Sequence, residues 1–491
     1  FVHIAPGHGF DDWELGNKHG LSVPETVLDD GLFAEHVPLF GGNHVFKADV
    51  LVIEKLKEAG CLLAKGKIQH SYPHSWRSKA PLIFRNTPQW FISMEINNLR
   101  KKALNAIEET AFFPTSGKRR LAGMIETRPD WCVSRQRAWG VPITVFVNKE
   151  TGEVLRDATV MGRIVEAIRE EGADAWFTSD PSRFLGDKFR AENYEQVMDI
   201  LDVWFDSGST HSFVLEDRDD LDWPASLYLE GSDQHRGWFQ SSLLLSLAGN
   251  GVAPYRNVLT HGFMVDADRE KISKSKQAGG HSKPQTAEAY IGSYGADIVR
   301  LWVASQDFRN DITVSEERIK KVAEAYRGIR NAFRYQLSNL YDFDPAQHTV
   351  ADGELTGLDR WILDAFAKLD ADVRTAFDKC EFHIAYQRIT QFVSVELSAV
   401  YHDTVKDRLY TSPVNSTRRR STQTAIYRLV QGFAKMLSPM IVVTADEAWE
   451  AIPHLDSASV HLTDWEPFEF SISAEESANW ETMFAIRERT L

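Results

Sequence analysis

A strongly polar stretch, EGSDQHRGWF at residues 230–239, stands between two apolar segments and constrains the fold more than any other part of the chain. The preceding residues 227–229 are typical of a short buried strand, and residues 241–248 are apolar enough for a packed helix. In an open parallel sheet such a strand-to-helix turn lies at the carboxyl ends of the strands, where ligands bind. Gly231 would allow a close backbone approach, and Asp233 would cap the following helix. An ordinary capped turn is the alternative, but it does not account for so many reactive side chains.

A second polar segment follows another predicted strand. VLTHGFMV at residues 258–265 is the strand, and KISKS at residues 271–275 comes after a polar turn. Lys271 and Lys274 suit a loop that grips a polyphosphate, because a lysine ammonium stabilises developing phosphate charge. A solvated basic loop is the alternative for the lysines alone.

These segments resemble the second half of the catalytic domain of class I aminoacyl-tRNA synthetases, and most closely the bacterial isoleucyl family. LDVWFDSGSTH at residues 201–211 matches the same family, and similar stretches extend over nearly the whole chain. The resemblance implies an α/β plus all-α architecture. It would combine the second half of a Rossmann-type catalytic domain with remnants of a β-rich editing domain and an α-helical anticodon-binding bundle. It also implies ATP-dependent activation of isoleucine, transfer to tRNA(Ile), and hydrolytic editing of mischarged valine.

The resemblance assigns roles to single residues of the catalytic domain. Lys271 and Lys274 would be catalytic and stabilise the phosphates, with Mg²⁺ arriving on ATP. Trp204 and Trp238 would line the isoleucine side-chain pocket, although without the resemblance either ring could equally be core. The residues that would hold the aminoacyl-adenylate and ATP are Glu230, Gly231, Asp233, Gln234, His261 and Ser273.

Histidines and carboxylates crowd one loop at residues 2–12, where glycines and a proline favour irregular backbone. By resemblance this loop belongs to the editing domain. There His3 would bind the terminal adenosine or substrate, and Asp12 would pair with the ammonium of the misattached amino acid. The residues alone leave two alternatives open. One is a metal site from His3, His8 and an aspartate, and the other is a helix cap from Asp11 or Asp12.

No zinc site is expected within this chain. Some family members have cysteines where Ser75 and Ser78 stand here, and the three cysteines of this sequence lie far apart. Widely spaced cysteines also fit a reducing cytosol. In bacterial relatives zinc is often bound by a C-terminal tail, which the full-length protein would supply.

Amphipathic patterns dominate the chain from about residue 311. TVSE at residues 313–316 is a capping-box pattern, and an apolar stripe at helical spacing follows it to residue 340. A second capping box is predicted at residues 444–447. In the family such a bundle grips the anticodon stem. Two basic clusters are candidates for contacts with tRNA phosphates, with a solvated surface as the alternative. They are Arg327, Arg330 and Arg334 in one, and residues 418–420 in the other.

Motifs and composition shifts predict the domain boundaries. We expect the C-terminal part of an editing domain at residues 1–68, a catalytic segment at 69–143 and a connective insertion at 144–198. The second half of the Rossmann-type domain would follow at 199–266, the KISKS loop with a linker at 267–310, and the anticodon-binding domain at 311–491.

The composition is that of a globular protein, with 43% hydrophobic and 25% charged residues. A net charge of −15 argues against a protein that coats nucleic acid without sequence preference, but it is compatible with local basic surfaces that bind RNA. The sequence has no apolar run of membrane-spanning length and no signal peptide. We therefore expect a cytoplasmic monomer without a membrane partner.

The chain begins at Phe1 without a methionine, and we interpret it as a fragment of a longer protein. It contains no HIGH-like histidine motif, so this polypeptide alone is expected not to activate isoleucine. Valyl-tRNA synthetase is the nearest alternative, disfavoured by the residues at 204–208 and 230–235. A different nucleotidyltransferase would lack the editing loop and the bundle, and a non-catalytic tRNA-binding fragment is a further alternative. A P-loop ATPase is excluded because GxxxxGK[ST] is absent.

Overall fold

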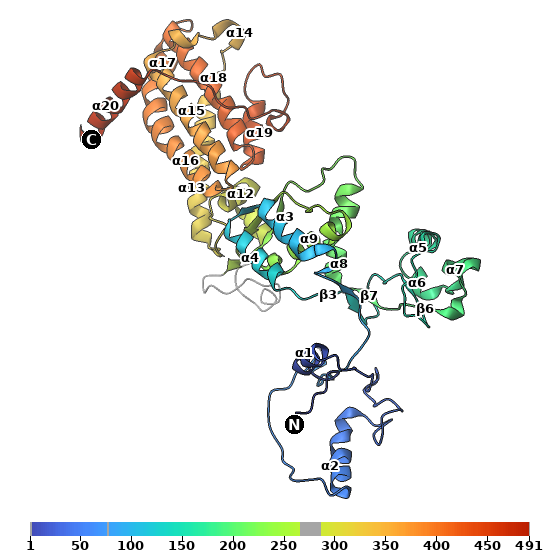
Figure 1. The fold of residues 1–491 in the computed structure, drawn as a ribbon. Coiled ribbons are helices and arrows are strands. Elements are labelled where there is room, and N and C mark those ends of the chain that lie inside the picture. The colour runs from blue at the N-terminus through green and yellow to red at the C-terminus, as the bar shows by residue number, and fades with distance from the viewer. Residues whose placement is uncertain (1, 76–77, 266–285, 491) are drawn as a thin grey trace. The chain divides into compact units, whose positions relative to one another are not determined.

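The computed structural model describes residues 2–75, 78–265 and 286–490 (Figure 1). The chain divides into two compact units, and each of them is discontinuous in sequence. The first unit comprises Phe1–Met94 and Pro129–Val203, and the second comprises Glu95–Arg128 and Trp204–Leu491. Residues 95–128 therefore belong with the sheet and helices that follow residue 204.

The amino-terminal part of the first unit contains helices α1 (Phe10–Lys18) and α2 (Ala48–Glu58) and the short 3-10 helix η1 (Val45–Lys47). The N-cap of α1 is Gly9, and no side chain caps this helix. The predicted cap from Asp11 or Asp12 is therefore wrong. The Asp12 carboxylate instead accepts the backbone N–H of Ala5 at 2.8 Å, which closes the loop before the helix.

The rest of the first unit is built from short antiparallel pairs and a small helical layer around buried aromatic rings. Phe146, Trp176 and Phe184 form this aromatic core, with 5.0 Å between the ring centroids of Phe146 and Trp176. The paired strands are β1 (Phe91–Ile92) with β3 (Trp131–Cys132), β4 (Ser134–Arg135) with β7 (Ile200–Leu201), and β5 (Phe146–Asn148) with β6 (Tyr194–Gln196). The helices are α5 (Ala158–Glu171), α6 (Ala175–Thr178) and α7 (Ser182–Leu185), with η3 (Gly186–Lys188) and η4 (Ala191–Asn193).

A parallel sheet organises the first part of the second unit. Its strand order is β2 (Ala111–Phe113), β9 (Asn257–His261) and β8 (Tyr228–Gly231), with all pairs parallel. Leu227 is 41% exposed and Leu229 51%, so the prediction of a buried strand is wrong at both leucines. Side chains alternate along a strand, so Leu229 points away from the face on which the neighbouring Tyr228 is buried. The helices associated with it are η2 (Ile96–Asn98), α3 (Leu99–Glu109), α4 (Ser116–Glu126) and α9 (Trp238–Gly249).

The strand predicted at residues 258–265 is interrupted at Gly262. Strand β9 ends at His261, and β10 (Met264–Val265) pairs with β11 (Ile312–Thr313) instead. A Cβ atom at Gly262 would meet the backbone of Asn310 and lie 2.7 Å from the backbone nitrogen of Asp311. The chain can therefore change partner here only because residue 262 lacks a side chain.

We expect Gly262→Ala to lower the free energy of unfolding by about 1–3 kcal/mol, because backbone atoms cannot move aside as a flexible side chain could. Gly249→Ala is the matched control, since a Cβ atom there would meet no heavy atom within 4 Å. Urea titration of both variants measures the difference. Equal stability of the two variants would contradict the proposed backbone clash.

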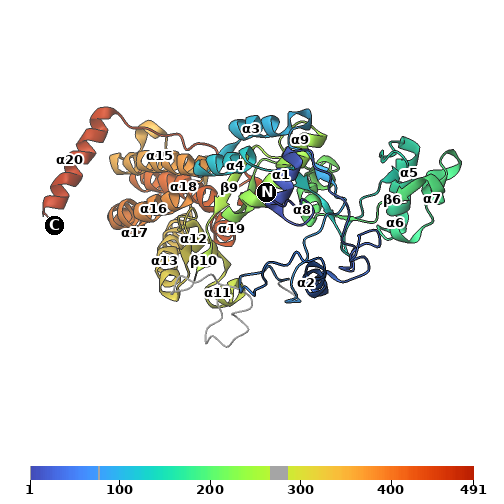
Figure 2. The ribbon, with the colours of Figure 1, turned by 60° about the horizontal axis from the view of Figure 1, so that its bottom comes forward.

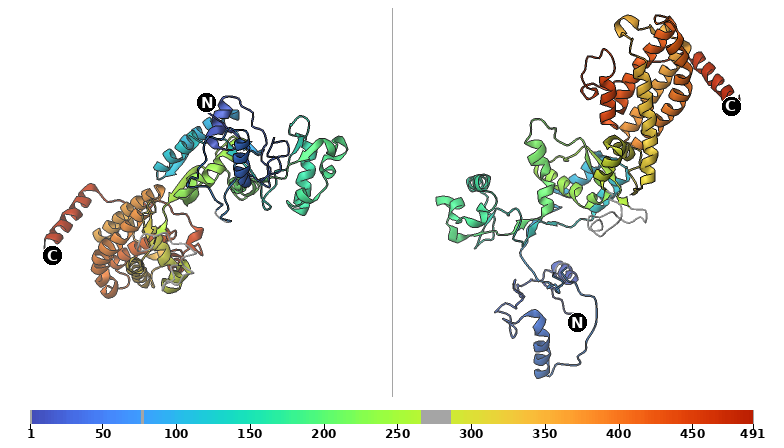
Figure 3. Two further views of the ribbon diagram at one scale, coloured as in Figure 1. Left: turned by 90° about the horizontal axis from the view of Figure 1, so that it is seen from below. Right: turned by 180° about the vertical axis from the view of Figure 1, so that it is seen from behind.

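The carboxyl-terminal half of the second unit is a helical bundle. The apolar stripe predicted for residues 319–340 is confirmed on α13, where Ile319, Val322, Ile329 and Phe333 are buried. Figure 2 shows α15, α16 and α18 side by side, and Figure 3 shows α20 at the outer end of the bundle. The helices are α11 (Ala287–Tyr294), α12 (Ala296–Ala304), α13 (Glu316–Ser338), α14 (Pro345–His348), α15 (Gly357–Asp378), α16 (Phe382–Phe392), η8 (Val393–His402), α17 (Asp403–Thr411), α18 (Thr417–Leu437), α19 (Val442–Glu450) and α20 (Ala474–Thr490). Short 3-10 turns are η7 (Asp352–Glu354) and η9 (Val460–Leu462).

Both predicted capping boxes are misplaced. Helix α13 is capped by the Ser315 side chain, which accepts the Arg318 N–H at 3.3 Å, rather than by a residue at 313. Helix α19 begins before Thr444, and its cap comes from α12. The buried Asp297 carboxylate accepts the N–H of Val443 at 3.3 Å and that of Thr444 at 2.7 Å. A carboxylate at a helix N-terminus satisfies free N–H groups whichever segment supplies it.

Candidate functional site

The carboxyl ends of β8 and β9 lie next to each other and bring several predicted site residues together. The parallel register pairs Glu230 with Thr260 and Gly231 with His261. The His261 ring nitrogen Nδ1 lies 2.7 Å from the carbonyl oxygen of Gly262, which fixes the imidazole at the strand end. This edge is therefore the position at which an open parallel sheet presents ligand-binding groups.

The 3-10 turn η6 (Ser232–Arg236) directs two more predicted residues to this edge. Asp233 lies over the end of β8, because a Cβ atom at Gly231 would be only 2.6 Å from the carboxylate Oδ1 of Asp233. The predicted cap of the next helix by Asp233 is wrong. Gln234 Oε1 accepts the N–H of Trp238 at 3.0 Å, and Gln234 Nε2 donates to Asp233 Oδ2 at 3.3 Å. Gln234 thus stabilises the start of α9 and holds Asp233 in place.

The two predicted pocket tryptophans both lie at the junction of η6 and α9. The Trp238 ring stacks on the buried Tyr228 ring with 4.0 Å between centroids and 7° between planes. Its Nε1–H donates to the carbonyl oxygen of Ser207 at 2.8 Å. Trp204, on α8 (Val203–Gly208), lies against Gly237, where a Cβ atom would be 2.7 Å from its ring. Both rings are therefore at the edge that carries Asp233.

Sequence reasoning missed three contributors to this edge: Tyr228, Ser207 and His235. Tyr228 had only a weak signal, as the single aromatic residue of the predicted strand. Ser207 acts through its backbone carbonyl, which no side-chain pattern reveals. His235 stood inside the polar motif, but its burial depends on helix α4, which is distant in sequence. The predicted catalytic residues Lys271 and Lys274 and the predicted adenylate- and ATP-binding Ser273 lie outside the described residues.

The predicted editing residues lie in the first unit. His3 is exposed, and Asp12 is bonded to the backbone of Ala5 at 2.8 Å. His8 uses both ring nitrogens within the fold, at 3.1 Å from the Phe84 carbonyl oxygen and 2.9 Å from the Thr26 hydroxyl. Among residues 2–75, 78–265 and 286–490, no three or more His, Cys, Asp or Glu side chains are grouped so that they could hold a metal ion.

The predicted basic row on α13 is partly neutralised by acidic neighbours. Arg327 pairs with Glu324 at 2.7 Å, and Arg330 pairs with Glu447 of α19 at 3.1 Å. Arg334, farther along the same helix, is exposed. Arg327 and Arg330, but not Arg334, line a groove of about 680 Å³ between α11 and α13, which Glu317, Lys320, Lys321 and Glu324 also line.

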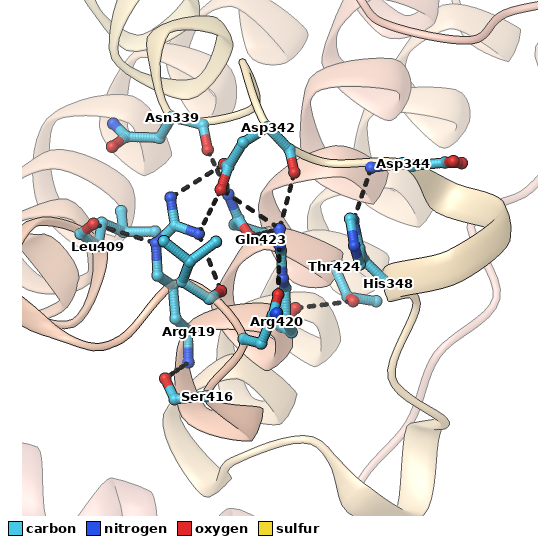
Figure 4. A network of polar contacts seen from close by, with 12 residues as sticks. Asn339, Asp342, Asp344, His348, Leu409, Ser416, Arg419, Arg420, Gln423 and Thr424 are labelled. Carbon is cyan, nitrogen blue, oxygen red and sulfur yellow. Dashed lines mark hydrogen bonds and ion pairs between the residues drawn. The ribbon is translucent and has the colours of Figure 1, made fainter.

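The second predicted basic cluster is mostly internal, and Figure 4 shows the contacts of Arg419 and Arg420 with Asp342. Arg419 is 3% exposed and Arg420 6%. The Arg419 guanidinium donates to both carboxylate oxygens of Asp342, at 2.7 and 2.9 Å, and Arg420 donates to the Asp342 carbonyl oxygen at 2.8 Å. A tRNA contact is therefore wrong for Arg419 and Arg420, because these groups complete a buried network; only Arg418 of this cluster is exposed.

The Asp342 carboxylate is held ionised by this network. Burial alone would raise the pKa of Asp342. The bonds from Arg419 and Gln423, with the charges of Arg419 and Arg420, nevertheless bring that pKa below its ordinary value. The arginines and the carboxylate thus form one charged cluster between α18 and the segment after α13.

Comparison with known sequences identifies relatives for nearly the whole chain. Residues 13–315 match the family described as "tRNA synthetases class I (I, L, M and V)", and residues 359–490 match "Anticodon-binding domain of tRNA ligase". Isoleucine–tRNA ligase of Nitrosococcus oceani is 49% identical over 484 residues, which are 98% of this chain and 50% of that protein. The Pelagibacter ubique isoleucine–tRNA ligase is 47% identical over 490 residues, covering 99% of this chain and 54% of that protein. The chain spans about half the length of the curated relatives it matches.

Solved structures show the same fold at low sequence identity. Methionyl-tRNA synthetase of Mycobacterium tuberculosis bound by methionyl-adenylate has a TM-score of 0.53 and 17% identity, covering 77% of this chain and 66% of that one. A LeuRS–tRNA–LeuAMS ternary complex from Agrobacterium radiobacter K84 has a TM-score of 0.50 and 15% identity, covering 94% of this chain and 48% of that one. The predicted fold class is therefore confirmed. Among the described residues, no helix has the length and apolar character needed to cross a membrane.

Proposed function

Because the chain belongs to the class I tRNA synthetases of the I, L, M and V group, we propose that it forms part of an isoleucine–tRNA ligase. Relatives at 47–49% identity over nearly all of this chain bear that name. The whole protein would join the isoleucine carboxylate to the α-phosphate of ATP, release pyrophosphate, and pass the aminoacyl group to a ribose hydroxyl of tRNA(Ile). The observation that supports this best is that Glu230, Gly231 and His261 lie together at the carboxyl ends of two paired parallel strands, with Asp233 over them.

The groups at this edge suit an aminoacyl-adenylate. Glu230 and Asp233 are exposed carboxylates that can accept hydrogen bonds from the ammonium group and the ribose hydroxyls. We propose that Gly231, Gln234 and His261 complete this contact surface. Catalysis would then come mainly from positioning and from stabilising charge on the phosphates. Lys271 and Lys274, with Ser273, would meet those phosphates, and Mg²⁺ would arrive on ATP.

The flat rings of Trp204 and Trp238 would enclose the isoleucine side chain. An apolar pocket of this kind distinguishes one methylene by only about 1–3 kcal/mol, and isoleucyl enzymes facing valine are the established example. A hydrolytic editing step would therefore be needed. We propose His3 and Asp12 for it, because an exposed imidazole and a nearby carboxylate suit the adenosine and the ammonium group of a mischarged tRNA.

We propose that α13 contributes to tRNA binding through Arg327, Arg330 and Arg334. Arg334 is the most direct candidate because Arg327 and Arg330 already have acidic partners. Contacts with phosphates would make the affinity for tRNA fall steeply as the salt concentration rises.

We further propose that the protein is a monomer in the cytoplasm, which size-exclusion chromatography and cell fractionation would test. Valyl-tRNA synthetase remains the alternative that the next experiment addresses.

We expect this polypeptide to bind a non-hydrolysable isoleucyl-adenylate analogue more tightly than the valyl analogue, as measured by calorimetry. Glu230→Ala should weaken isoleucyl binding about 10- to 100-fold, because a charged hydrogen-bond acceptor is lost. Glu195→Ala is the matched control, since Glu195 is an exposed strand glutamate on β6 in the other unit. Valyl preference, or binding that Glu230→Ala leaves unchanged, would contradict the proposal. Isoleucine-dependent exchange of labelled pyrophosphate into ATP is not expected, because the 491 residues hold no HIGH-like motif.

A further inference from the structure

His235 is buried beside the candidate adenylate site and has one unpartnered nitrogen. The residue is 2% exposed, and its Nδ1 lies 2.8 Å from the carbonyl oxygen of Ser232. A carbonyl oxygen can only accept a hydrogen bond, so Nδ1 carries the proton. In the neutral ring Nε2 is then an unprotonated acceptor. Nε2 is buried and has no hydrogen-bond partner among the described residues. A buried polar atom of this kind requires an explanation.

The ring occupies a space that Gly117 leaves open. A Cβ atom at Gly117 would lie 3.0 Å from His235 Nε2, and Gly117 belongs to the first turn of α4. On its other side the His235 ring meets Phe239 edge to face, with 5.7 Å between centroids and 89° between planes. His235 is therefore wedged between the start of α4 and the start of α9.

This position connects the two outer strands of the sheet. Helix α4 follows β2, and η6 follows β8, while β9 runs between those strands. Because η6 packs against α4, the His235 ring joins segments on either side of the β9 end. The imidazole is also held neutral. Burial is the main cause that lowers the pKa of His235; the hydrogen bond to Ser232 opposes it, the Arg120 charge lowers the pKa further, and the Asp233 charge raises it least.

We propose that His235 is a positioning residue of the adenylate site. Its bond to Ser232 and its wedge against Gly117 hold η6 in the conformation that presents Asp233 and Gln234 at the sheet edge. This inference rests on the proposed function for the identity of the ligand. The fixed turn itself can be tested without any ligand.

Hydrogen exchange of the segment 232–237 tests the positioning role directly. His235→Phe keeps an aromatic ring but cannot donate to Ser232, and it should accelerate exchange in this segment about tenfold. His235→Asn keeps a donor at the Nδ1 position and should restore slow exchange. Gly117→Ala should also accelerate exchange, because it displaces the ring while leaving His235 intact. Gly123→Ala is its control, since a Cβ atom there meets nothing within 4 Å.

Binding of the isoleucyl-adenylate analogue forms the second arm of the experiment. His235→Phe and Gly117→Ala should weaken binding about tenfold, and His235→Asn and Gly123→Ala should not. The wild-type protein could fail to bind the analogue while hydrogen exchange in the variants changes as expected. In that case the proposed function is wrong, but the conclusion that His235 fixes the turn at residues 232–237 is still supported. Unchanged exchange in both Gly117→Ala and His235→Phe would overturn the proposal. So would faster exchange with unchanged affinity, because the turn would then not position the ligand groups.

Discussion

Replacing Asp359 by alanine is expected to lower the free energy of unfolding of the helical bundle by about 3–5 kcal/mol, the usual cost of removing one partner from a buried charged network. Asp359 is 0% exposed, and its carboxylate accepts from the hydroxyl groups of Tyr401 at 2.7 Å and Ser421 at 2.6 Å. It also accepts from Thr356 and Thr422, and the Arg408 guanidinium lies 3.5 Å away. Without the carboxylate these donors lose their acceptor in a site that water does not reach.

Urea unfolding followed by circular dichroism measures this effect. Asp352→Ala is the matched control, because Asp352 also pairs with an arginine, Arg428 at 2.8 Å, but is 63% exposed at the side chain. An exposed pair contributes at most about 1 kcal/mol, so the control should remain close to wild type. If the unfolding free energies of Asp359→Ala and Asp352→Ala differed by less than about 1 kcal/mol, the prediction would be wrong, and the hydroxyl groups around Asp359 and the Arg408 guanidinium would have found other partners.

The bundle therefore depends on internal polar groups as well as on apolar packing. Asp359 on α15 contacts side chains of η8 and α18, and Asp342 binds two arginines of α18. These contacts fix α18 against its neighbours. A tRNA-binding surface on α13 would rest on the same scaffold, because α13 packs against both η8 and α18.

Local patterns in the sequence predicted the elements but not their partners. The apolar stripe after residue 319 predicted α13, and the polar motif at 230–239 predicted a turn between a strand and a helix; both are confirmed. The same patterns could not show that Asp297 caps a helix almost 150 residues later in the chain. A helix N-terminus accepts any suitable oxygen, so the choice depends on packing rather than on spacing.

Charge clusters were misinterpreted for a related reason. Three consecutive arginines are typical of a solvated or phosphate-binding surface, yet Arg419 and Arg420 are internal because Asp342 lies against them. That acidic partner is 77 residues away from Arg419 in sequence. Similarly, the break of a strand at Gly262 depends on the backbone of Asn310, which no local hydrophobic pattern contains. Sequence spacing thus located the candidate site, and tertiary packing determined which groups face it.

Trp238→Ala is expected to weaken binding of the isoleucyl-adenylate analogue about 100-fold or more, because a large aromatic contact disappears and the loop behind it loosens. The Trp238 ring lies 4.0 Å from the Tyr228 ring and donates from Nε1 to Ser207 at 2.8 Å. Its removal would therefore affect the proposed pocket and the helix that carries Trp204. Trp238→Phe retains a stacked ring and loses only the donor, so its loss should be about tenfold.

Calorimetry with both the isoleucyl and the valyl analogue, together with thermal unfolding of each variant, separates a pocket role from a core role. If Trp238 forms the pocket, Trp238→Ala should reduce the preference for the isoleucyl analogue, and Trp238→Phe should keep most of it. If the ring is only core, both analogues should lose affinity equally while the melting temperature falls. Unchanged affinity of a folded Trp238→Ala variant would show that the side-chain pocket lies elsewhere on the sheet edge. Because a phenylalanine ring at position 238 can still stack on Tyr228 and alanine cannot, the comparison of the two variants shows how far amino-acid selection depends on an aromatic ring at this position.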